Sequence, residues 1–374
     1  MGSERRDVII IGAGPAGLAV AGRLRKEKTP FIILEQSNFI ANSWRQHYDR
    51  LCLHTVRDLS NLPHLAFPSD YPQYVPRDFL IAYYENYAQE FQIEPKFNAK
   101  VKKVERVHDG WKVRTADDKT FVSDQVVVAT GTNRIPYEPE FRDQDVFAGE
   151  VIHSRSYKNP KHYLDKKVLV IGMGNTGAEI SLDLANHGVQ TYISVRGPIN
   201  VIPRDLNGRP VQTTAKLLDK LPFGLGNWIG AKIRDVYFGD LSPYGLQRSK
   251  LAPIDQLMQT GKTPVIDIGT IDMIKKGKIK VIPGIDRFEK NAVVYNGSQH
   301  IDLDAVILAT GYRSKLEDFI PGVEGFLDQF SYPKSPIGTG DLEGLYFIGF
   351  DNYKLGGLLG TIREDSLIIA EAIV

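Results

Sequence analysis

A glycine-rich unit that occurs twice in the chain constrains the fold more than any other feature. Each copy has a short apolar stretch, a Gly-x-Gly-x-x-Gly turn and a stretch with helical spacing, starting at Val8 in the first copy and at Val168 in the second. A continuous apolar run before such a turn is typical of a buried parallel strand. Each copy then returns as another apolar stretch, Phe31–Glu35 or Thr191–Arg196. The sequence therefore predicts two βαβ units.

This glycine spacing suits a dinucleotide. The first glycine permits the tight turn, the second lets a pyrophosphate approach bare backbone, and the third lets the helix pack against the strand. Two such turns, each followed about 20 residues later by a polar residue at a strand end, are a specific signal, and glycine turns without a ligand are the alternative. The predicted contacts are Gly12, Gly14, Pro15, Ala16 and Gly17 in the first turn, and Gly172, Gly174, Asn175, Thr176 and Gly177 in the second.

The residues at the two strand ends differ in charge, and this difference sorts the ligands. Glu35, followed by Gln36, can accept hydrogen bonds from ribose hydroxyls and would repel a 2′-phosphate, whereas Arg196 suits a 2′-phosphate. The first site should hold an adenosine with free hydroxyls, and the second should hold NADPH. Two dinucleotides in one chain imply a bound flavin that the nicotinamide reduces, so FAD and NADPH are the predicted cofactors.

Two further apolar strands, Gln125–Val128 and Ala305–Leu308, each end in the same three residues, Ala-Thr-Gly. Small residues there permit close approach of a cofactor or of a connecting chain, although a purely structural strand end is the alternative. The residues predicted at the FAD site are Ala129, Thr130 and Gly131, and those predicted at the NADPH site are Ala309, Thr310 and Gly311.

The predicted organisation is nested. We expect an α/β fold of two Rossmann-like dinucleotide-binding domains, with the NADPH domain inserted into the FAD domain. The FAD domain would comprise residues 1–155 and 306–374, and the NADPH domain residues 160–305. A helical pattern of apolar residues over 221–238 is expected to pack in the core or between domains, with a lid or a membrane-surface patch as alternatives.

Length, charge and cysteine content exclude several other classes. At 374 residues the chain exceeds one ordinary domain of about 100–200 residues. Its 46 Lys and Arg nearly balance its 45 Asp and Glu, so no nucleic-acid partner is expected. The single cysteine, Cys52, cannot supply the redox-active pair of a flavoprotein disulfide reductase, and it favours a reducing compartment such as the cytoplasm. The histidines show no metal-ligand spacing, so no metal is predicted.

The N-terminal stretch has the outline of a secretory signal, because two arginines precede an apolar run. The glycine spacing explains the same run better as a strand that leads into a helix, and the run is shorter than the roughly 20 residues of a transmembrane helix. We therefore expect neither a targeting segment nor an integral membrane segment.

Two motifs indicate a known family. Phe147, Gly149, His153 and Tyr157 fit FxGxxxHxxxY, and Ala309–Tyr312 reads ATGY. With these motifs the chain resembles the flavin-containing monooxygenases, class B flavoproteins that use FAD and NADPH. The resemblance extends over nearly the whole length of the chain. Within this family it is most similar to YUCCA-type indole-3-pyruvate monooxygenases, in residues 43–44, 48–51, 53–54, 67–68, 71–72, 261–265, 277–281 and 309–314.

The resemblance implies an NADPH-dependent flavin monooxygenase that transfers oxygen from a flavin C4a-peroxide to a small organic substrate. The reaction would be heteroatom oxygenation or oxidative decarboxylation of an aryl 2-oxo acid. An NADPH-flavin reductase or oxidase that makes hydrogen peroxide, and a non-catalytic flavin-binding sensor, are the alternatives. The expected partners are the substrate and O2, and a homodimer is left open.

The resemblance also suggests roles for single residues. The family's usual GGxW is Ala41–Trp44 here, which places Ser43 and Trp44 at FAD. Many heteroatom-oxygenating members carry an Asn where this chain has His54 or Thr55, so His54 is a predicted catalytic residue, with a core histidine as the alternative. Asn175, in the second glycine turn, is also predicted to be catalytic, with turn geometry alone as the alternative. His153 is expected near a cofactor or at a hinge, with packing between domains as the alternative, and Tyr157 is expected to be structural.

Overall fold

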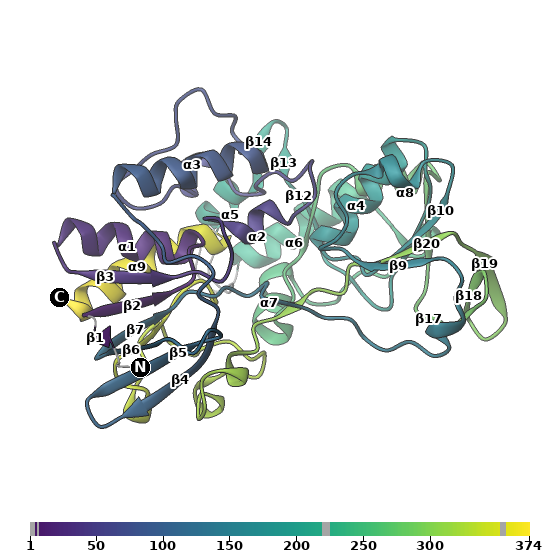
Figure 1. The fold of residues 1–374 in the computed structure, drawn as a ribbon. Coiled ribbons are helices and arrows are strands. Elements are labelled where there is room, and N and C mark those ends of the chain that lie inside the picture. Colours follow the sequence, from purple (N-terminus) through teal and green to yellow (C-terminus); the bar gives the residue numbers. More distant parts are fainter. Residues whose placement is uncertain (1–3, 6, 219–224, 352–356) are drawn as a thin grey trace. The chain divides into compact units, whose positions relative to one another are not determined.

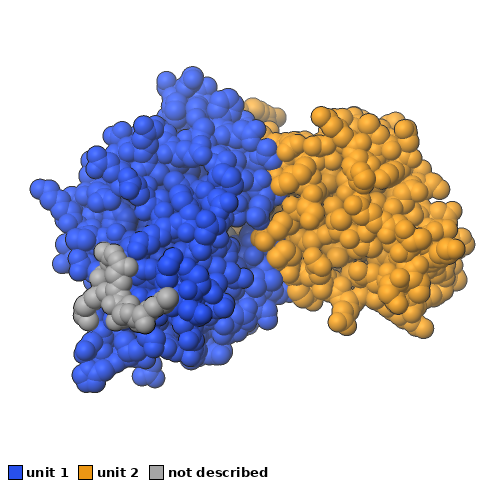
Figure 2. Space-filling view, viewed as in Figure 1, with its two compact units in different colours: residues 1–46, 55–135, 312–374 blue, residues 47–54, 136–311 orange. Residues whose placement is uncertain are grey.

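This computed structural model describes residues 4–5, 7–218, 225–351 and 357–374 (Figure 1). The chain divides into two compact units, coloured separately in Figure 2. Unit 1 comprises residues 1–46, 55–135 and 312–374, and unit 2 comprises residues 47–54 and 136–311. Each unit contains a parallel sheet that includes the strand before one of the two glycine turns.

The parallel sheet of unit 1 has the strand order β22-β7-β2-β3. Its strand β2 is fully buried, because Ile9 and Ile11 belong to one core cluster while Ile10 faces the helix after the glycine turn. That helix, α1, packs against α9. The elements are β2 (Val8–Ile11), α1 (Pro15–Lys26), β3 (Phe31–Leu34), β7 (Gln125–Val128), β22 (Leu345–Phe347) and α9 (Gly357–Ile373).

Unit 1 also contains a second sheet, in the order β1-β6-β5-β4, two further helices, and strand β21 (Tyr312–Arg313), which pairs with β8 (Ile135–Pro136). Helix α3 carries an aromatic face that includes Tyr83, Tyr84 and Tyr87, all buried. The elements are β1 (Glu4–Arg5), α2 (Asn42–Arg45), α3 (Arg77–Glu90), β4 (Val101–Val107), β5 (Gly110–Thr115), β6 (Thr120–Ser123) and short 3-10 turns at Arg57–Leu59, Leu316–Asp318, Glu324–Phe326 and Gly340–Leu342.

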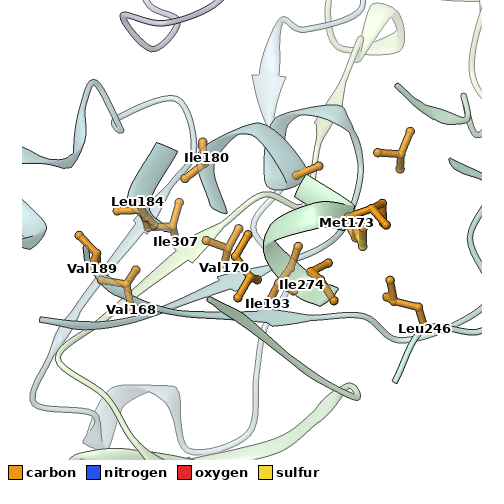
Figure 3. Close-up of a cluster of buried hydrophobic side chains, with 14 of the residues drawn as sticks. Val168, Val170, Met173, Ile180, Leu184, Val189, Ile193, Leu246, Ile274 and Ile307 are labelled. Atoms are coloured by element: carbon orange, nitrogen blue, oxygen red, sulfur yellow. The ribbon is translucent and has the colours of Figure 1, made fainter. Parts of the chain in front are cut away.

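The parallel sheet of unit 2 has the order β16-β11-β10-β20-β9. Both faces of β10 are buried: Val168 and Val170 point into the cluster shown in Figure 3, and Leu169 and Ile171 into a second cluster. Continuous apolar sequence is the pattern that a doubly covered parallel strand requires. The elements are β9 (Glu150–His153), β10 (Lys167–Ile171), α4 (Asn175–Asn186), β11 (Gln190–Ser194), α8 (Thr270–Lys275), β16 (Ile279–Ile282) and β20 (Ala305–Leu308).

The remaining elements of unit 2 are an antiparallel sheet, β17-β18-β19, and an insertion between β11 and β16. The antiparallel sheet comprises β17 (Ile285–Glu289), β18 (Ala292–Tyr295) and β19 (Gln299–Asp302). The insertion includes β12 (Val201–Pro203), β13 (Asp205–Leu206), β14 (Arg209–Pro210), α5 (Val211–Leu218), α6 (Leu225–Phe238), a 3-10 turn at Ser242–Tyr244, α7 (Pro253–Thr260) and β15 (Val265–Asp267). Further 3-10 turns of the unit lie at Gln144–Val146 and Pro160–Tyr163.

The α/β fold with two Rossmann-like units is confirmed, and the limits of the units differ from the expected domain boundaries. Residues 136–159 and 306–311 belong to unit 2, because β9 and β20 pair within its sheet. Residues 47–54 also belong to unit 2, although they follow the first βαβ unit in the sequence.

Helix α6 departs from the expectation for 221–238. Residues 221–224 lie outside the described residues, and α6 starts at Leu225. Trp228, Val236 and Tyr237 are 60%, 85% and 53% exposed, so core packing is wrong for these three side chains. Arg234 and Phe238 of the same helix are buried, and α6 contacts α5, α7 and β12.

Candidate functional site

The two glycine turns have nearly the same backbone geometry. Gly12 and Gly172 adopt φ of +108° and +107°, a region that residues other than glycine rarely adopt. A Cβ on either residue would lie 2.6 Å from a carbonyl oxygen, that of Ala129 or that of Ala309. The first glycine of each turn therefore lets the Ala-Thr-Gly end of a neighbouring strand pass close to it.

The third glycine of each turn is required by helix packing. A Cβ on Gly17 would lie 2.0 Å from the carbonyl oxygen of Gly12, and one on Gly177 would lie 1.9 Å from that of Gly172. No rotamer change relieves a clash with backbone. These glycines therefore hold α1 and α4 against the ends of β2 and β10.

The middle glycine of each turn is required by neither conformation nor packing. Gly14 and Gly174 are the N-caps of α1 and α4, with φ of −82° and −86°, which any residue adopts. A Cβ on either would have no atom within 4 Å. Bare backbone thus faces open space at a helix N-terminus, where free N–H groups and the helix dipole favour an anion. This cradle fits a dinucleotide pyrophosphate in both units.

The other residues of the two turns lie in the first helical turn. Pro15 occupies the N1 position of α1, where its missing N–H costs nothing, and Ala16 follows it. Asn175 and Thr176 begin α4. The Asn175 side chain has a structural partner, because its Oδ1 accepts a hydrogen bond of 2.7 Å from the backbone N–H of Ile266 in β15.

Glu35 lies at the end of β3, where the sequence predicts a ribose contact. Its carboxylate is buried and accepts hydrogen bonds from Ala13 N–H (2.8 Å), Ser37 N–H (2.9 Å) and Ser37 Oγ (2.7 Å). Only one of these reaches Oε2, and a carboxylate oxygen can accept two bonds, so Oε2 can still receive a hydroxyl. Gln36 beside it is exposed.

Arg196 follows β11 at the equivalent position of unit 2 and has the opposite character. Its side chain is exposed and packs its methylene groups beside Gly284. Within the described residues it has neither an ion pair nor a hydrogen bond. An unpaired guanidinium at this strand end fits a 2′-phosphate.

The predicted Ser43 and Trp44 lie in α2, next to the first glycine turn. Ala41 adopts φ of +56° before this helix, and its N–H donates to the carbonyl of Ala13 within the turn (3.0 Å). Ser43 is exposed and Trp44 is half-buried, with its ring 6.4 Å from that of Tyr84. The backbone of the turn therefore sets the position of α2.

The threonine hydroxyls of the two Ala-Thr-Gly ends differ in their hydrogen bonds. Thr310 Oγ1 donates to the carbonyl of Tyr137 (2.5 Å) within unit 2. Thr130 Oγ1 is fully buried and has no hydrogen-bond partner among the described residues. Gly131 beside it has open space where a Cβ would lie. A buried hydroxyl without a partner is costly, so a bound group beside Thr130 would satisfy it.

The FxGxxxHxxxY motif has structural contacts within unit 2. A Cβ on Gly149 would lie 2.6 Å from the carbonyl oxygen of Asp304, and Phe147 packs its ring 5.4 Å from that of Phe288. His153 Nε2 donates to the carbonyl of Gly311 (3.1 Å), while its Nδ1 accepts from the N–H of Arg155 (3.1 Å).

Burial shifts the pKa of two residues in this motif, in opposite directions. Burial lowers the pKa of His153 below its ordinary value of 6.5, which agrees with a neutral ring that accepts at Nδ1. The Tyr157 hydroxyl donates to Asp183 Oδ2 (2.7 Å), and burial, then this carboxylate, raises the pKa of Tyr157 well above its ordinary range. Both side chains are engaged with protein groups.

His54 lies in the segment of residues 47–54, which packs within unit 2. Its Nε2 lies 2.6 Å from Oε1 of Glu179 on α4, and both side chains are largely buried. Sequence reasoning missed Glu179 and Asp183. Two acidic residues four apart inside an otherwise apolar helical stretch were the available signal.

Unit 2 also has a surface pocket that the sequence did not indicate. Its volume is about 440 Å³, and Arg204, Asp205 and Asp267 line it together with Phe238 and Lys275. Asp267 accepts a 3.0 Å hydrogen bond from the N–H of Ile271 at the start of α8, and burial raises its pKa.

Comparison with known proteins decides the family. A family model described as "Flavin-binding monooxygenase-like" matches residues 5–321. The chain belongs to this family. The flavin-binding monooxygenase-like chain is 38% identical over 363 residues to the probable indole-3-pyruvate monooxygenase YUCCA3 of Arabidopsis thaliana, covering 93% of this chain and 83% of that protein. It is 36% identical to the indole-3-pyruvate monooxygenase YUCCA1 of Oryza sativa subsp. japonica, covering 99% of this chain and 93% of that protein.

Solved structures agree with the fold. A flavin-containing monooxygenase from Stenotrophomonas maltophilia superposes with a TM-score of 0.75 at 19% identity, covering 99% of this chain and 100% of that chain. Cyclohexanone monooxygenase from Rhodococcus sp. Phi1, bound to NADP+, gives 0.79 at 17% identity, covering 100% and 84%.

The family membership confirms the predicted activity class and cofactors. The protein is an FAD- and NADPH-dependent monooxygenase, and the reductase, oxidase and sensor alternatives are not favoured. No helix in the described part of the chain has both the length and the apolar character needed to cross a membrane. Among the same residues, no group of three or more His, Cys, Asp or Glu could hold a metal ion.

Proposed function

We propose that this monooxygenase oxidatively decarboxylates aryl 2-oxo acids. The observation that carries the proposal is the similarity of nearly the whole chain to proteins named as indole-3-pyruvate monooxygenases. In the balanced reaction, one 2-oxo acid, one O2, one NADPH and one proton give the acid one carbon shorter, CO2, NADP+ and water. The bond between the carbonyl carbon and the carboxylate breaks, one oxygen atom enters the new carboxylate, and NADPH supplies the two electrons.

The two cofactors are assigned to separate units. FAD would bind in unit 1, with its pyrophosphate over Gly14 at the N-terminus of α1, a ribose hydroxyl on Glu35 Oε2, and the orphan Thr130 hydroxyl as a further partner. Ser43 and Trp44 complete this predicted site on α2. The chemistry supplied by bound FAD is acceptance of hydride and activation of O2.

NADPH would bind in unit 2. Its pyrophosphate would lie over Gly174 at the N-terminus of α4, and Arg196 would pair with the 2′-phosphate. Thr176 and Gly177 complete the turn, while Ala309 and Thr310 support it from the adjacent strand end.

The protein's own residues contribute mostly binding and orientation. Asn175 holds β15 through its carbonyl oxygen, which leaves its amide hydrogens as donors toward a ligand at the turn. His54 would hold or move a proton at the nitrogen that does not face Glu179. We further expect a reducing compartment, the cytoplasm, because a single cysteine forms no internal disulfide. A homodimer stays a prediction, which the molar mass measured by size-exclusion chromatography with light scattering would test.

Product analysis tests the substrate class. Purified enzyme is supplied with NADPH, O2 and either indole-3-pyruvate or phenylpyruvate, and the shortened acid, CO2, NADPH and hydrogen peroxide are measured. The expected result is one shortened acid and one CO2 for each NADPH consumed. Oxygenated product from an amine or a sulfide, with no turnover of the 2-oxo acids, would refute the proposed substrate.

A further inference from the structure

Glu179 and His54 form an isolated polar contact inside unit 2. His54 Nε2 lies 2.6 Å from Glu179 Oε1. Both atoms are fully buried, and neither has a hydrogen-bond partner elsewhere in the part of the chain that the structure describes. An unsatisfied buried polar atom is costly, so the imidazole and the carboxylate can only satisfy each other.

The two nitrogens of His54 lie in different surroundings. Nε2 is buried against Glu179, while the side chain as a whole keeps 14% of its surface exposed. A neutral imidazole carries one proton, on either nitrogen. An ionised carboxylate can only accept a hydrogen bond, so a carboxylate beside Nε2 draws the proton to that nitrogen and leaves the lone pair on Nδ1.

The segment that carries His54 is attached to α4 at a second point. Arg50 Nη1 lies 3.7 Å from Oδ1 of Asp183, which follows Glu179 by one turn of the same helix. Tyr48, nearer the start of the segment, is buried in the core cluster of unit 2. The backbone of the segment is thus fixed on α4 by contacts that do not involve the His54 ring.

We propose that Glu179 is a positioning residue that holds His54 as the Nε2–H tautomer and so presents Nδ1 as a proton acceptor. This inference rests on the proposed function, in which His54 acts on the substrate. The ligand that Nδ1 suits is one that donates a hydrogen bond, such as the enol hydroxyl of an aryl 2-oxo acid. Glu179 acts only through His54.

Nitrogen NMR of the FAD-loaded enzyme labelled with ¹⁵N-histidine tests the tautomer directly. The His54 signals are identified by their loss in His54→Gln. The unmodified protein is expected to show a neutral ring with the proton on Nε2, and a proton on Nδ1 would overturn the proposal without any further variant. In Glu179→Gln both tautomers are expected, because a glutamine amide can donate or accept.

Asp183→Asn is the matched control. It makes the same change one helical turn away, on the carboxylate that faces Arg50 rather than His54. Its His54 tautomer should match that of the unmodified protein. A tautomer retained in Glu179→Gln, or lost equally in Asp183→Asn, would overturn the role of Glu179, since the effect would then belong to docking of the segment.

Steady-state kinetics give the second readout. General acid–base contributions are typically about 10²–10⁴-fold, so Glu179→Gln should lower kcat with a 2-oxo acid by at least roughly tenfold. The rate of anaerobic flavin reduction by NADPH should stay close to that of the unmodified enzyme. An equal fall in flavin reduction would contradict the proposal.

The two proposals fail differently. If the unmodified enzyme makes no shortened acid from 2-oxo acids, the proposed substrate is wrong. If His54 nevertheless shows an Nε2–H tautomer that depends on Glu179 and not on Asp183, the positioning role stands.

Discussion

Replacing Gly174 with alanine separates a glycine that a ligand requires from one that the fold requires. Gly174 has an ordinary φ of −86°, and an added Cβ would meet no atom within 4 Å. Three residues later, a Cβ on Gly177 would lie 1.9 Å from the carbonyl oxygen of Gly172. Gly177→Ala is therefore the matched control, with the same added methyl group in the same turn.

Gly174→Ala is expected to weaken NADP+ binding and to leave stability nearly unchanged, whereas Gly177→Ala is expected to lower stability. For Gly174→Ala, a gain of about 0.4–1 kcal/mol from the restricted unfolded chain roughly cancels the loss of a preferred N-cap residue. Its methyl group would displace a pyrophosphate from the N–H groups of α4, and charge-assisted hydrogen bonds are worth about 1.5–3 kcal/mol. The Kd for NADP+ should rise roughly 10–100-fold. Gly177→Ala should lose about 1–3 kcal/mol of stability or more through overpacking.

Calorimetric titration of the FAD-loaded enzyme with NADP+ measures binding, and thermal unfolding followed by circular dichroism measures stability. We expect Gly174→Ala to melt close to the unmodified protein and to bind NADP+ weakly, and Gly177→Ala to melt several degrees lower. Unchanged NADP+ affinity in Gly174→Ala would refute the reasoning, because the turn would then be a structural feature without a ligand.

Three other side chains give predictions of different kinds. Arg196→Ala should lower the preference for NADPH over NADH in kcat/KM by roughly 10–100-fold, because the Arg196 guanidinium has no other partner in the described chain. Arg209→Ala, at another exposed arginine, is the control, and a preference for NADPH that is retained in Arg196→Ala would contradict the assignment. Because burial depresses the pKa of His153, its stabilising contribution is present above pH 6.5 and is lost as pH falls toward the lower folded value. His153→Gln should flatten the dependence of the urea midpoint on pH in that window, and an unchanged slope would contradict this. Tyr157→Phe leaves the buried Asp183 carboxylate without its hydroxyl donor, so unfolding in urea should show a loss of about 1–3 kcal/mol with NADP+ affinity unchanged, and an unchanged midpoint would argue against this contact.

The two βαβ units could be predicted from the sequence because the residues that form each strand, turn and helix are neighbours in the chain. The strands before Gly12 and Gly172, the helices after them and the strand ends at Glu35 and Arg196 follow from neighbouring residues alone. Burial of β2 and β10 on both faces also follows from their uninterrupted apolar sequence.

Contacts between distant segments escaped prediction for the same reason. Nothing near Tyr48 or His54 in the sequence indicates that residues 47–54 pack against α4 rather than within unit 1. The packing depends on Glu179 and Asp183, which are more than 120 residues away in a helix that reads as apolar. The amphipathic pattern of α6 likewise does not tell which apolar residues face the core, because Phe238 is buried while Trp228 is exposed.

The internal duplication separates the demands of packing from those of the ligand. Positions that sterics dictate are the same in both copies. A Cβ added to the first or third glycine would clash with backbone in each turn, at nearly equal distances in the two copies. Positions that packing leaves free differ in a way that chemistry explains. Glu35 is an acceptor where Arg196 is a cation, and the Thr130 hydroxyl has no partner among the described residues where that of Thr310 bonds to Tyr137. The middle glycine is constrained neither by packing nor by a positive φ and is nevertheless identical in both copies, as expected if both turns hold a group that FAD and NADPH have in common, the pyrophosphate.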